Sequence, residues 1–199
     1  MPESIATVCS IIGLLDDGWD GLGATARAHI ARATCLIGAG RKLELIAPHA
    51  PAARAHNMDG ALTRTPGWIE DAAAAGGYSV VLATGDPLCH GIAHFLVGKL
   101  GAARVEVLPA PSTLQLAFAR LKKPWQAARF ASCHGADAGE WQPNPLQPSP
   151  GPAHGLYGLM RAVAQHQLVA SFTSPANSPD RIARALLVAG YGAPGGGED

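Results

Sequence analysis

The stretch VVLATGDPLCHGI, residues 80–92, passes from an apolar run through a Gly-Asp-Pro break into a helical pattern. The Val, Leu and Ala residues before the break are typical of a buried strand. Asp86 is a favoured helix N-cap and Pro87 a favoured first helical residue, so helix initiation alone explains the break. Gly85 offers a second interpretation, because a residue without a side chain at the carboxyl end of a parallel strand lets a ligand approach the backbone.

Strand-like and helix-like runs alternate on both sides of this unit. Such alternation predicts an α/β fold, in which a mostly parallel sheet carries helices on its faces. The expected strands are residues 5–12, 34–37, 79–83, 105–108, 129–132 and 168–172, and the expected helices are residues 24–32, 68–75, 91–100, 112–121, 155–165 and 179–188.

Two prolines in the segment Pro109-Ala110-Pro111 permit neither a helix interior nor a central strand. We therefore expect an N-terminal α/β domain over residues 1–109 and a C-terminal α/β domain over residues 110–199. Residues 135–153 are rich in proline and predict a long exposed loop, and the glycine-rich residues 190–199 predict a flexible tail.

The composition excludes several classes of protein. The 199 residues have a formal net charge of zero and only 15% charged side chains, which argues against nucleic-acid binding. The longest apolar run, residues 8–15, is far shorter than the roughly 20 residues that cross a bilayer. No basic segment precedes an apolar one at the N-terminus, and the four scattered cysteines are best interpreted as reduced thiols. These features predict a cytoplasmic protein with no membrane or nucleic-acid partner.

Two local patterns have structural explanations. Ser112 and Gln115 have the S-x-x-Q spacing of a capping box at the start of a helix. His90 and His94 are one helical turn apart, but no further ligands have suitable spacing, so we predict no metal site. Ser112 directly follows the expected domain boundary, which also makes it a candidate ligand contact.

Taken together, several stretches resemble the tetrapyrrole (corrin) methylases, and among these the branch that methylates carbon 5 of precorrin-6Y. The similarity covers most of residues 5–192. The stretches that carry it are IIGLLDDGWDGL (11–22), LIGAGRKLEL (36–45), VVLATGDPLCHGI (80–92), VEVLPAPSTLQLAFARLKKPWQAARFASCHG (105–135) and SPANSPDRIARALLVAGYG (174–192).

The resemblance implies two α/β domains that bind S-adenosylmethionine in a cleft between them, with a shortened second domain. It further implies that the strand end at Gly85 and the helix start at Ser112 both contact the bound cofactor. Carried over residue by residue, the cofactor-binding positions are Gly85, Asp86, Pro87, Leu88, Cys89, Ser112 and Thr113.

The resemblance also implies the reaction: an S-adenosylmethionine-dependent C-methyltransferase that acts on carbon 5 of a late precorrin in cobalamin biosynthesis. Gly13 and Asp16 lie where the family's first loop closes over the cleft, and Arg41 is a candidate partner for the substrate carboxylates. No catalytic residue is predicted, because methyl transfer from a sulfonium needs little acid–base chemistry at the nucleophile. The implied partners are a second copy of the chain, in a homodimer, and a separate decarboxylating carbon-15 methyltransferase.

Some positions depart from the family pattern and keep two alternatives open. The family's G-x-G after the first strand reads Gly13-Leu14-Leu15, His90 replaces an aromatic residue, and Ala136 replaces a basic one. One alternative is a non-catalytic homologue that binds cofactor or corrinoid as a scaffold. The other is a methylase for a different tetrapyrrole.

Overall fold

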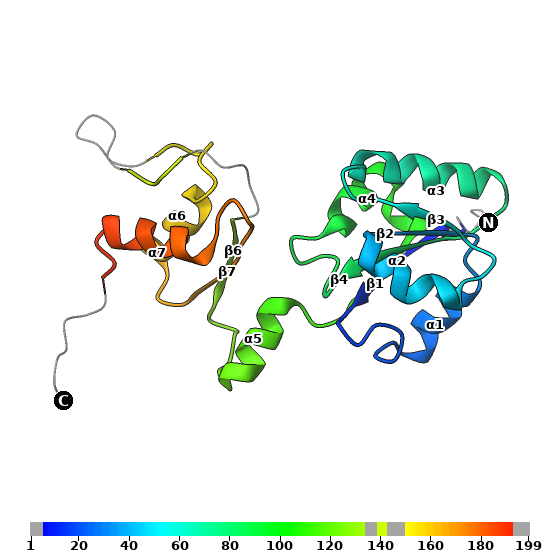
Figure 1. Ribbon diagram of the computed structural model, residues 1–199, viewed down its shortest axis with the longest axis horizontal. Helices are drawn as coiled ribbons and strands as arrows, with labels where there is room; N and C mark the ends of the chain where they lie inside the picture. Colours follow the sequence, from blue (N-terminus) through cyan, green and yellow to red (C-terminus); the bar gives the residue numbers. More distant parts are fainter. Residues whose placement is uncertain (1–5, 134–138, 143–149, 193–199) are drawn as a thin grey trace. The chain divides into compact units, whose positions relative to one another are not determined.

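The structure is a computed structural model that describes residues 6–133, 139–142 and 150–192 (Figure 1). The chain divides into two compact units, Met1–Thr113 and Leu114–Asp199. The predicted boundary after residue 109 lies shortly before this division. No helix among the described residues is both long enough and apolar enough to cross a membrane.

The first unit is built on a five-stranded sheet in the order β3-β2-β4-β1-β5, with every neighbouring pair parallel. All six residues of β1 and five of the six in β4 are buried, as expected for central strands covered on both faces. The strands are β1 (Cys9–Leu14), β2 (Cys35–Gly38), β3 (Arg54–Asn57), β4 (Ser79–Thr84) and β5 (Val105–Leu108).

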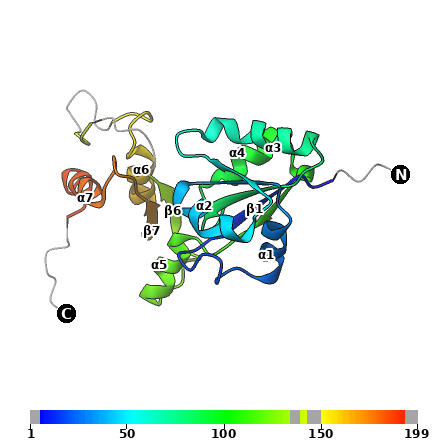
Figure 2. The same ribbon diagram turned by 45° about the vertical axis from the view of Figure 1, so that its right-hand side comes forward.

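Two helices cover each face of this sheet (Figures 1 and 2). On one face, α1 (Ala24–Ala31) and α2 (Gly40–Ile46) pack Ile30 and Ile46 into a fully buried core. On the other face, α3 (Thr65–Ala74) and α4 (Ile92–Leu100) pack Ile69 and Leu96 into a second buried core. Short 3-10 helices are η1 (Ala47–His49), η2 (Leu62–Arg64) and η3 (Ala102–Arg104).

The topology separates the loops that follow β1 and β4. These strands are neighbours, but the chain leaves β1 toward α1 on one face and leaves β4 toward α4 on the opposite face. Such a divergence opens a crevice at the carboxyl ends of the strands, where open α/β sheets bind their ligands. The fold therefore directs attention to the segments after Leu14 and Thr84.

The second unit contains a parallel pair of strands, β6 (Arg129–Ser132) and β7 (Val169–Phe172), and the helices α6 (Tyr157–Gln165) and α7 (Pro179–Val188). Helix α5 (Thr113–Leu121) begins at the division between the units. The core of the second unit includes Leu156 and Met160. The two sheets with flanking helices confirm the predicted α/β class. Within the described residues the second sheet has only two strands.

Several sequence predictions were wrong in detail. The first strand begins at Cys9 and continues to Leu14, so Gly13 lies inside a strand and not in the loop after it. Helix α2 and strand β3 were not predicted at all.

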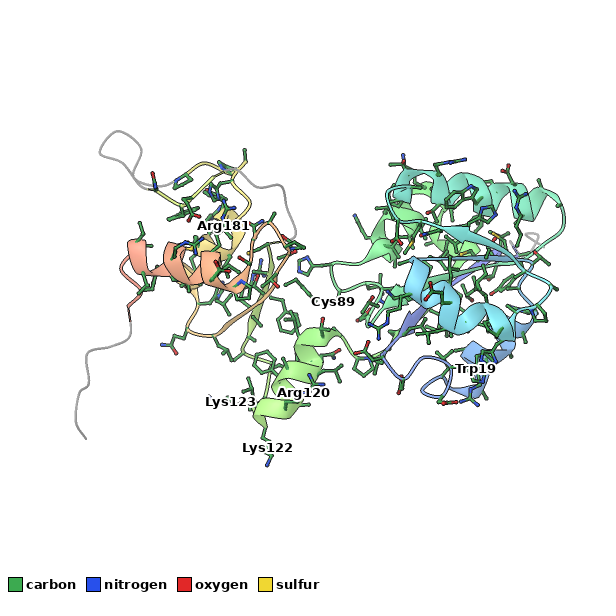
Figure 3. All side chains as sticks on the ribbon, viewed as in Figure 1. Trp19, Cys89, Arg120, Lys122, Lys123 and Arg181 are labelled. Atoms are coloured by element: carbon green, nitrogen blue, oxygen red, sulfur yellow. The ribbon has the colours of Figure 1, made fainter. Side chains whose placement is uncertain are left out.

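Where the structure describes residues 135–153, they contain no helix or strand, and residues 139, 140, 142, 152 and 153 are exposed as predicted, whereas Trp141 is not. Trp141 is 5% exposed and packs edge-on against His154, with ring centroids 5.2 Å apart. Arg181 of α7 donates hydrogen bonds to the carbonyl oxygens of Gly139 and Ala176 (Figure 3). The rest of that loop, residues 134–138 and 143–149, and the predicted tail at 193–199 lie outside the described residues.

Helix α5 ends in a Schellman motif in which Lys122 occupies the position that usually holds glycine. The Lys122 amide donates to the Ala119 carbonyl oxygen and the Lys123 amide to the Phe118 carbonyl oxygen. Lys122 has a φ of 53°, a left-handed conformation that costs a side-chain-bearing residue about 1 kcal/mol (Figure 3). Lys122→Gly should therefore raise the free energy of unfolding by about 1 kcal/mol, measured by urea denaturation.

The neighbouring lysine supplies the control for this variant. Lys123 is exposed like Lys122 but is not among the residues with positive φ. Lys123→Gly should leave stability unchanged or lower it, because glycine only adds freedom to the unfolded chain there. Equal effects of the two substitutions would contradict the backbone explanation.

Candidate functional site

Backbone hydrogen bonds join the carboxyl ends of strands β1, β4 and β5 in the first unit. Gly85, directly after β4, donates its amide to the Leu14 carbonyl oxygen of β1 at 2.9 Å. The Gly85 carbonyl oxygen accepts the amide of Ala110, which follows β5, at 3.3 Å. One residue thus fixes the exits of β1, β4 and β5 relative to one another.

Glycine is required at two positions of this junction. A Cβ atom at Gly13 would lie 2.5 Å from the Ala110 amide nitrogen and closer still to the Gly85 carbonyl oxygen. Gly85 has a φ of 60°, and a Cβ atom there would lie 3.0 Å from the Pro111 carbonyl oxygen and 3.3 Å from the Ser112 Cα. Gly85 and Ser112 are therefore in backbone contact, with no room for a ligand directly between them.

The loop after Gly85 forms a tight turn before α4. The Asp86 carboxylate accepts the Leu88 amide at 2.8 Å, and the Asp86 carbonyl oxygen accepts the Cys89 amide at 3.1 Å. The predicted role of Asp86 as helix N-cap is wrong, because Gly91 occupies that position and α4 begins at Ile92. Asp86 instead stabilises an Asx turn, which leaves its second carboxylate oxygen available on the loop.

A side-chain hydrogen bond between Cys89 and Ser112 closes this turn against the segment after β5. Ser112 is 3% exposed, although it lies at the start of a helix. Burial and then the nearby Asp86 charge raise the pKa of the Cys89 thiol, while the Ser112 hydrogen bond acts in the opposite direction. Cys89 is therefore a neutral thiol at physiological pH, suited to contact and not to nucleophilic attack.

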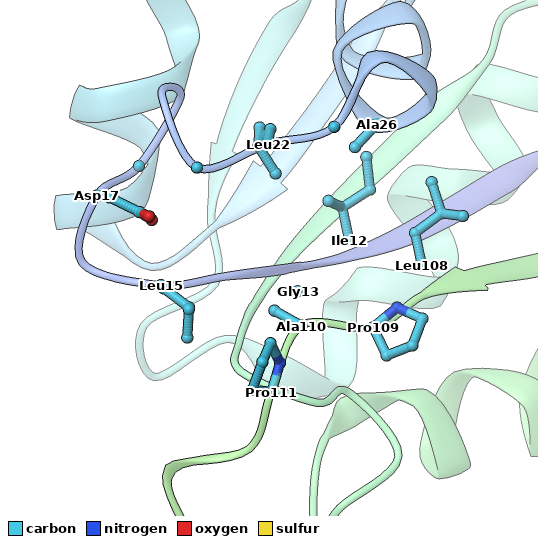
Figure 4. A pocket seen from close by; sticks show the side chains of 13 residues that line it. Ile12, Gly13, Leu15, Asp17, Leu22, Ala26, Leu108, Pro109, Ala110 and Pro111 are labelled. Carbon is cyan, nitrogen blue, oxygen red and sulfur yellow. The ribbon is translucent and has the colours of Figure 1, made fainter. Parts of the chain in front are cut away.

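A pocket of about 190 Å³ lies beside this junction, between the β1–α1 loop and the segment after β5 (Figure 4). Its walls combine backbone at Gly13 and Ala110 with the apolar side chains of Ile12, Leu22 and Leu108. Pockets that enclose a whole small ligand usually measure roughly 300–1,000 Å³. This pocket has room for part of such a ligand.

The structure groups some of the predicted site residues and leaves others apart. Gly85, Asp86, Cys89 and Ser112 are linked to one another by the contacts above, and Pro87 is buried behind them with its carbonyl oxygen on the Ala93 amide at 3.0 Å. Leu88 is 58% exposed. Gly13 lines the pocket, whereas Asp16 and Arg41 are exposed and do not line it. Thr113 is the first residue of α5, beside Ser112.

Sequence reasoning missed Asp17 and the Pro109–Pro111 segment as parts of the site. Asp17 is the one carboxylate that lines the described pocket, and Figure 4 shows it on the loop above β1. The segment 109–111 was interpreted only as a domain boundary, yet it forms one wall of the pocket. The sequence gives no signal for this wall, because it depends on the register of β5 with β1, which places residue 109 next to Gly13.

Comparison with known proteins places this geometry in a family. Residues 8–195 match the family of Tetrapyrrole (Corrin/Porphyrin) Methylases. A Precorrin-6Y C(5,15)-methyltransferase [decarboxylating] from Sinorhizobium sp. is 37% identical over 134 residues, which is 67% of this chain and 32% of that protein. The protein of the same name from Mycobacterium tuberculosis (strain ATCC 25618 / H37Rv) is 35% identical over 111 residues, 56% of this chain and 27% of its own length.

The matched segments are thus about a third or less of the length of these relatives. Among solved structures, that of the methyltransferase CobJ has a TM-score of 0.68 at 19% identity, covering 92% of this chain and 74% of CobJ. This likeness concerns the fold alone. Because the family match spans nearly the whole sequence, the chain belongs to the tetrapyrrole (corrin/porphyrin) methylase family.

Proposed function

We propose that the chain binds S-adenosylmethionine at the junction of β1, β4 and β5 and transfers its methyl group to carbon 5 of a late precorrin. The observation that carries the proposal is the joining of Gly85 and Ser112 at a switch point of the sheet. Two sequence segments with the family pattern, remote along the chain, meet there without intervening side chains. The reaction named for the Sinorhizobium relative supports a precorrin as the substrate class.

The residues of the junction suit such a cofactor. Glycine at positions 13 and 85 lets the strand ends pack closely together, and Asp86 supplies a carboxylate that can attract a cationic ammonium or sulfonium group. The buried Ser112 hydroxyl and the neutral Cys89 thiol offer uncharged contacts. We assign cofactor binding to Gly85, Asp86, Pro87, Leu88, Cys89, Ser112 and Thr113, and substrate contact to Gly13, Asp16 and Arg41.

The cofactor, when bound, supplies an electrophilic methyl group on a positively charged sulfur. The contribution of the protein is then mainly to orient the two reacting partners and to exclude water, which can lower a barrier by roughly 7–11 kcal/mol in favourable cases. The rigid backbone network around Gly85 is suited to that role, since it fixes three strand ends at once. Asp86 and Ser112 act as positioning residues in this proposal, and no group is assigned to proton transfer.

The test is a transfer assay with S-adenosylmethionine that carries ¹³C in its methyl group and a precorrin that lacks the carbon-5 methyl. We expect the pigment to gain one ¹³C-labelled methyl group in place of a proton, seen as the mass of one labelled CH2 and a ¹³C resonance at carbon 5. A product labelled at another carbon would contradict the regiochemistry and favour a methylase for a different position. Tight binding of cofactor without any label in the pigment would contradict catalysis and favour the scaffold alternative.

A further inference from the structure

A second cavity, of about 550 Å³, lies in the first unit at the opposite end of the sheet from the Gly85 junction. Cys35 and Arg54, the first residues of β2 and β3, lie in its wall, as does the turn at Gly76 and Gly77 before β4. The cavity exists because β3 is an edge strand, so one flank of α3 has no neighbouring helix beyond it. The side chains that give it chemical character are Arg54, His56, Arg64, Trp68, Asp71 and Ala72.

The charges in this cavity are unbalanced. Two guanidinium groups, those of Arg54 and Arg64, face one carboxylate, that of Asp71. Within the described part of the chain neither arginine makes an ion pair. Arg64 lies over the ring of Trp68 at 5.4 Å, and this contact holds the guanidinium toward the cavity without neutralising it.

His56 adds no charge to this balance. Its ring stacks on Trp68 with centroids 4.7 Å apart. Partial burial, followed by the charges of Arg54 and Arg64, lowers the pKa of His56, and Asp71 opposes the shift only in part. The neutral imidazole, the indole and Ala72 therefore give the cavity an uncharged surface next to a net positive one.

We infer that this cavity is a binding site for an organic anion with a single carboxylate or phosphate group. The anionic group lies between the guanidiniums of Arg54 and Arg64, whose planar donors match the oxygens of either group. The uncharged body of the ligand lies along Trp68 and Ala72, since the volume exceeds what a bare anion fills. Asp71 disfavours ligands that carry a second anionic group. The site is separate from the proposed cofactor site and does not depend on it.

The experiment follows the His56 ring by NMR while benzoate or phenyl phosphate is added to the full chain. A bound anion stabilises the imidazolium, so the titration midpoint of His56 should move to higher pH. By reciprocity the anion should bind more tightly below that midpoint than above it. The two probes distinguish a carboxylate site from a phosphate site, and benzyl alcohol, which is uncharged, should leave the midpoint unchanged.

Three variants complete the test. Arg54→Gln and Arg64→Gln should each weaken the binding of the better probe at least tenfold, because each removes charge-assisted hydrogen bonds. Lys99→Gln removes one exposed positive charge from α4, away from the cavity, and should change the affinity less than twofold. Circular dichroism spectra must show all three variants folded. A His56 midpoint that neither anion moves would overturn the inference, and so would an equal loss of affinity in Lys99→Gln.

Discussion

Replacement of Gly13 by alanine should lower the free energy of unfolding by about 3 kcal/mol and abolish measurable binding of S-adenosylhomocysteine, the demethylated cofactor. The added Cβ would lie 2.5 Å from the Ala110 nitrogen and nearer still to the Gly85 oxygen. Both neighbours are backbone atoms in a hydrogen-bonded junction and cannot rotate away, so the strand ends must separate. Overpacking of this kind costs roughly 1–3 kcal/mol in well-packed sites.

The same substitution at a second glycine, Gly98, shows whether the effect depends on the position or only on the change from glycine to alanine. Gly98 is in α4, and a Cβ atom there would have no atom within 4 Å. Gly98→Ala should raise stability by about 1 kcal/mol through helix propensity and leave cofactor affinity unchanged. Urea denaturation and calorimetry would measure both quantities. Normal S-adenosylhomocysteine affinity in a folded Gly13→Ala protein would contradict the placement of the site at this junction.

Asp86→Ala should weaken S-adenosylhomocysteine binding by about tenfold or more. The substitution removes both the carboxylate charge and the acceptor for the Leu88 amide, which holds the turn after β4. Loss of a charge-assisted contact with the ligand costs roughly 1.5–3 kcal/mol, which corresponds to about a 10- to 150-fold change in affinity. Isothermal titration calorimetry measures the change directly.

Two further variants show which property of Asp86 matters. Asp86→Asn keeps an oxygen acceptor for the Leu88 amide but removes the charge, so we expect an affinity between those of the wild type and Asp86→Ala. Glu44→Gln removes an exposed negative charge from α2 in the same unit and should have no effect. If Asp86→Ala bound the ligand as well as the wild type, Asp86 would have no place in the site.

The sequence predicted most of the first sheet because its central strands, β1 and β4, are mostly apolar. Strand β3 was not predicted because Arg54, His56 and Asn57 make it polar. Only its pairing with β2 identifies it as a strand. Helix α2 was missed for a different reason: it begins at Gly40, with one residue between it and β2, in a Gly-Ala-Gly sequence that is typical of a loop. Trp141 is buried because it packs against His154, which is remote along the chain, and no local sequence pattern indicates such a contact.

The candidate site was predictable in part. The family pattern identified Gly85, Asp86 and Ser112, and the structure links all three through backbone contacts and Cys89. The local interpretation of Asp86 as a helix cap was wrong because the loop extends to Gly91 before α4 begins. The requirement for glycine at position 13 could not be inferred, since it depends on the register that brings β1 between β4 and β5.

The most direct measurement is a calorimetric titration of the full chain with S-adenosylhomocysteine at constant pH and salt concentration. We expect saturable binding with one ligand per chain, since each chain has one junction where the strand exit at Gly85 contacts the segment at Ser112. A folded protein that takes up no ligand at millimolar concentration would contradict this expectation.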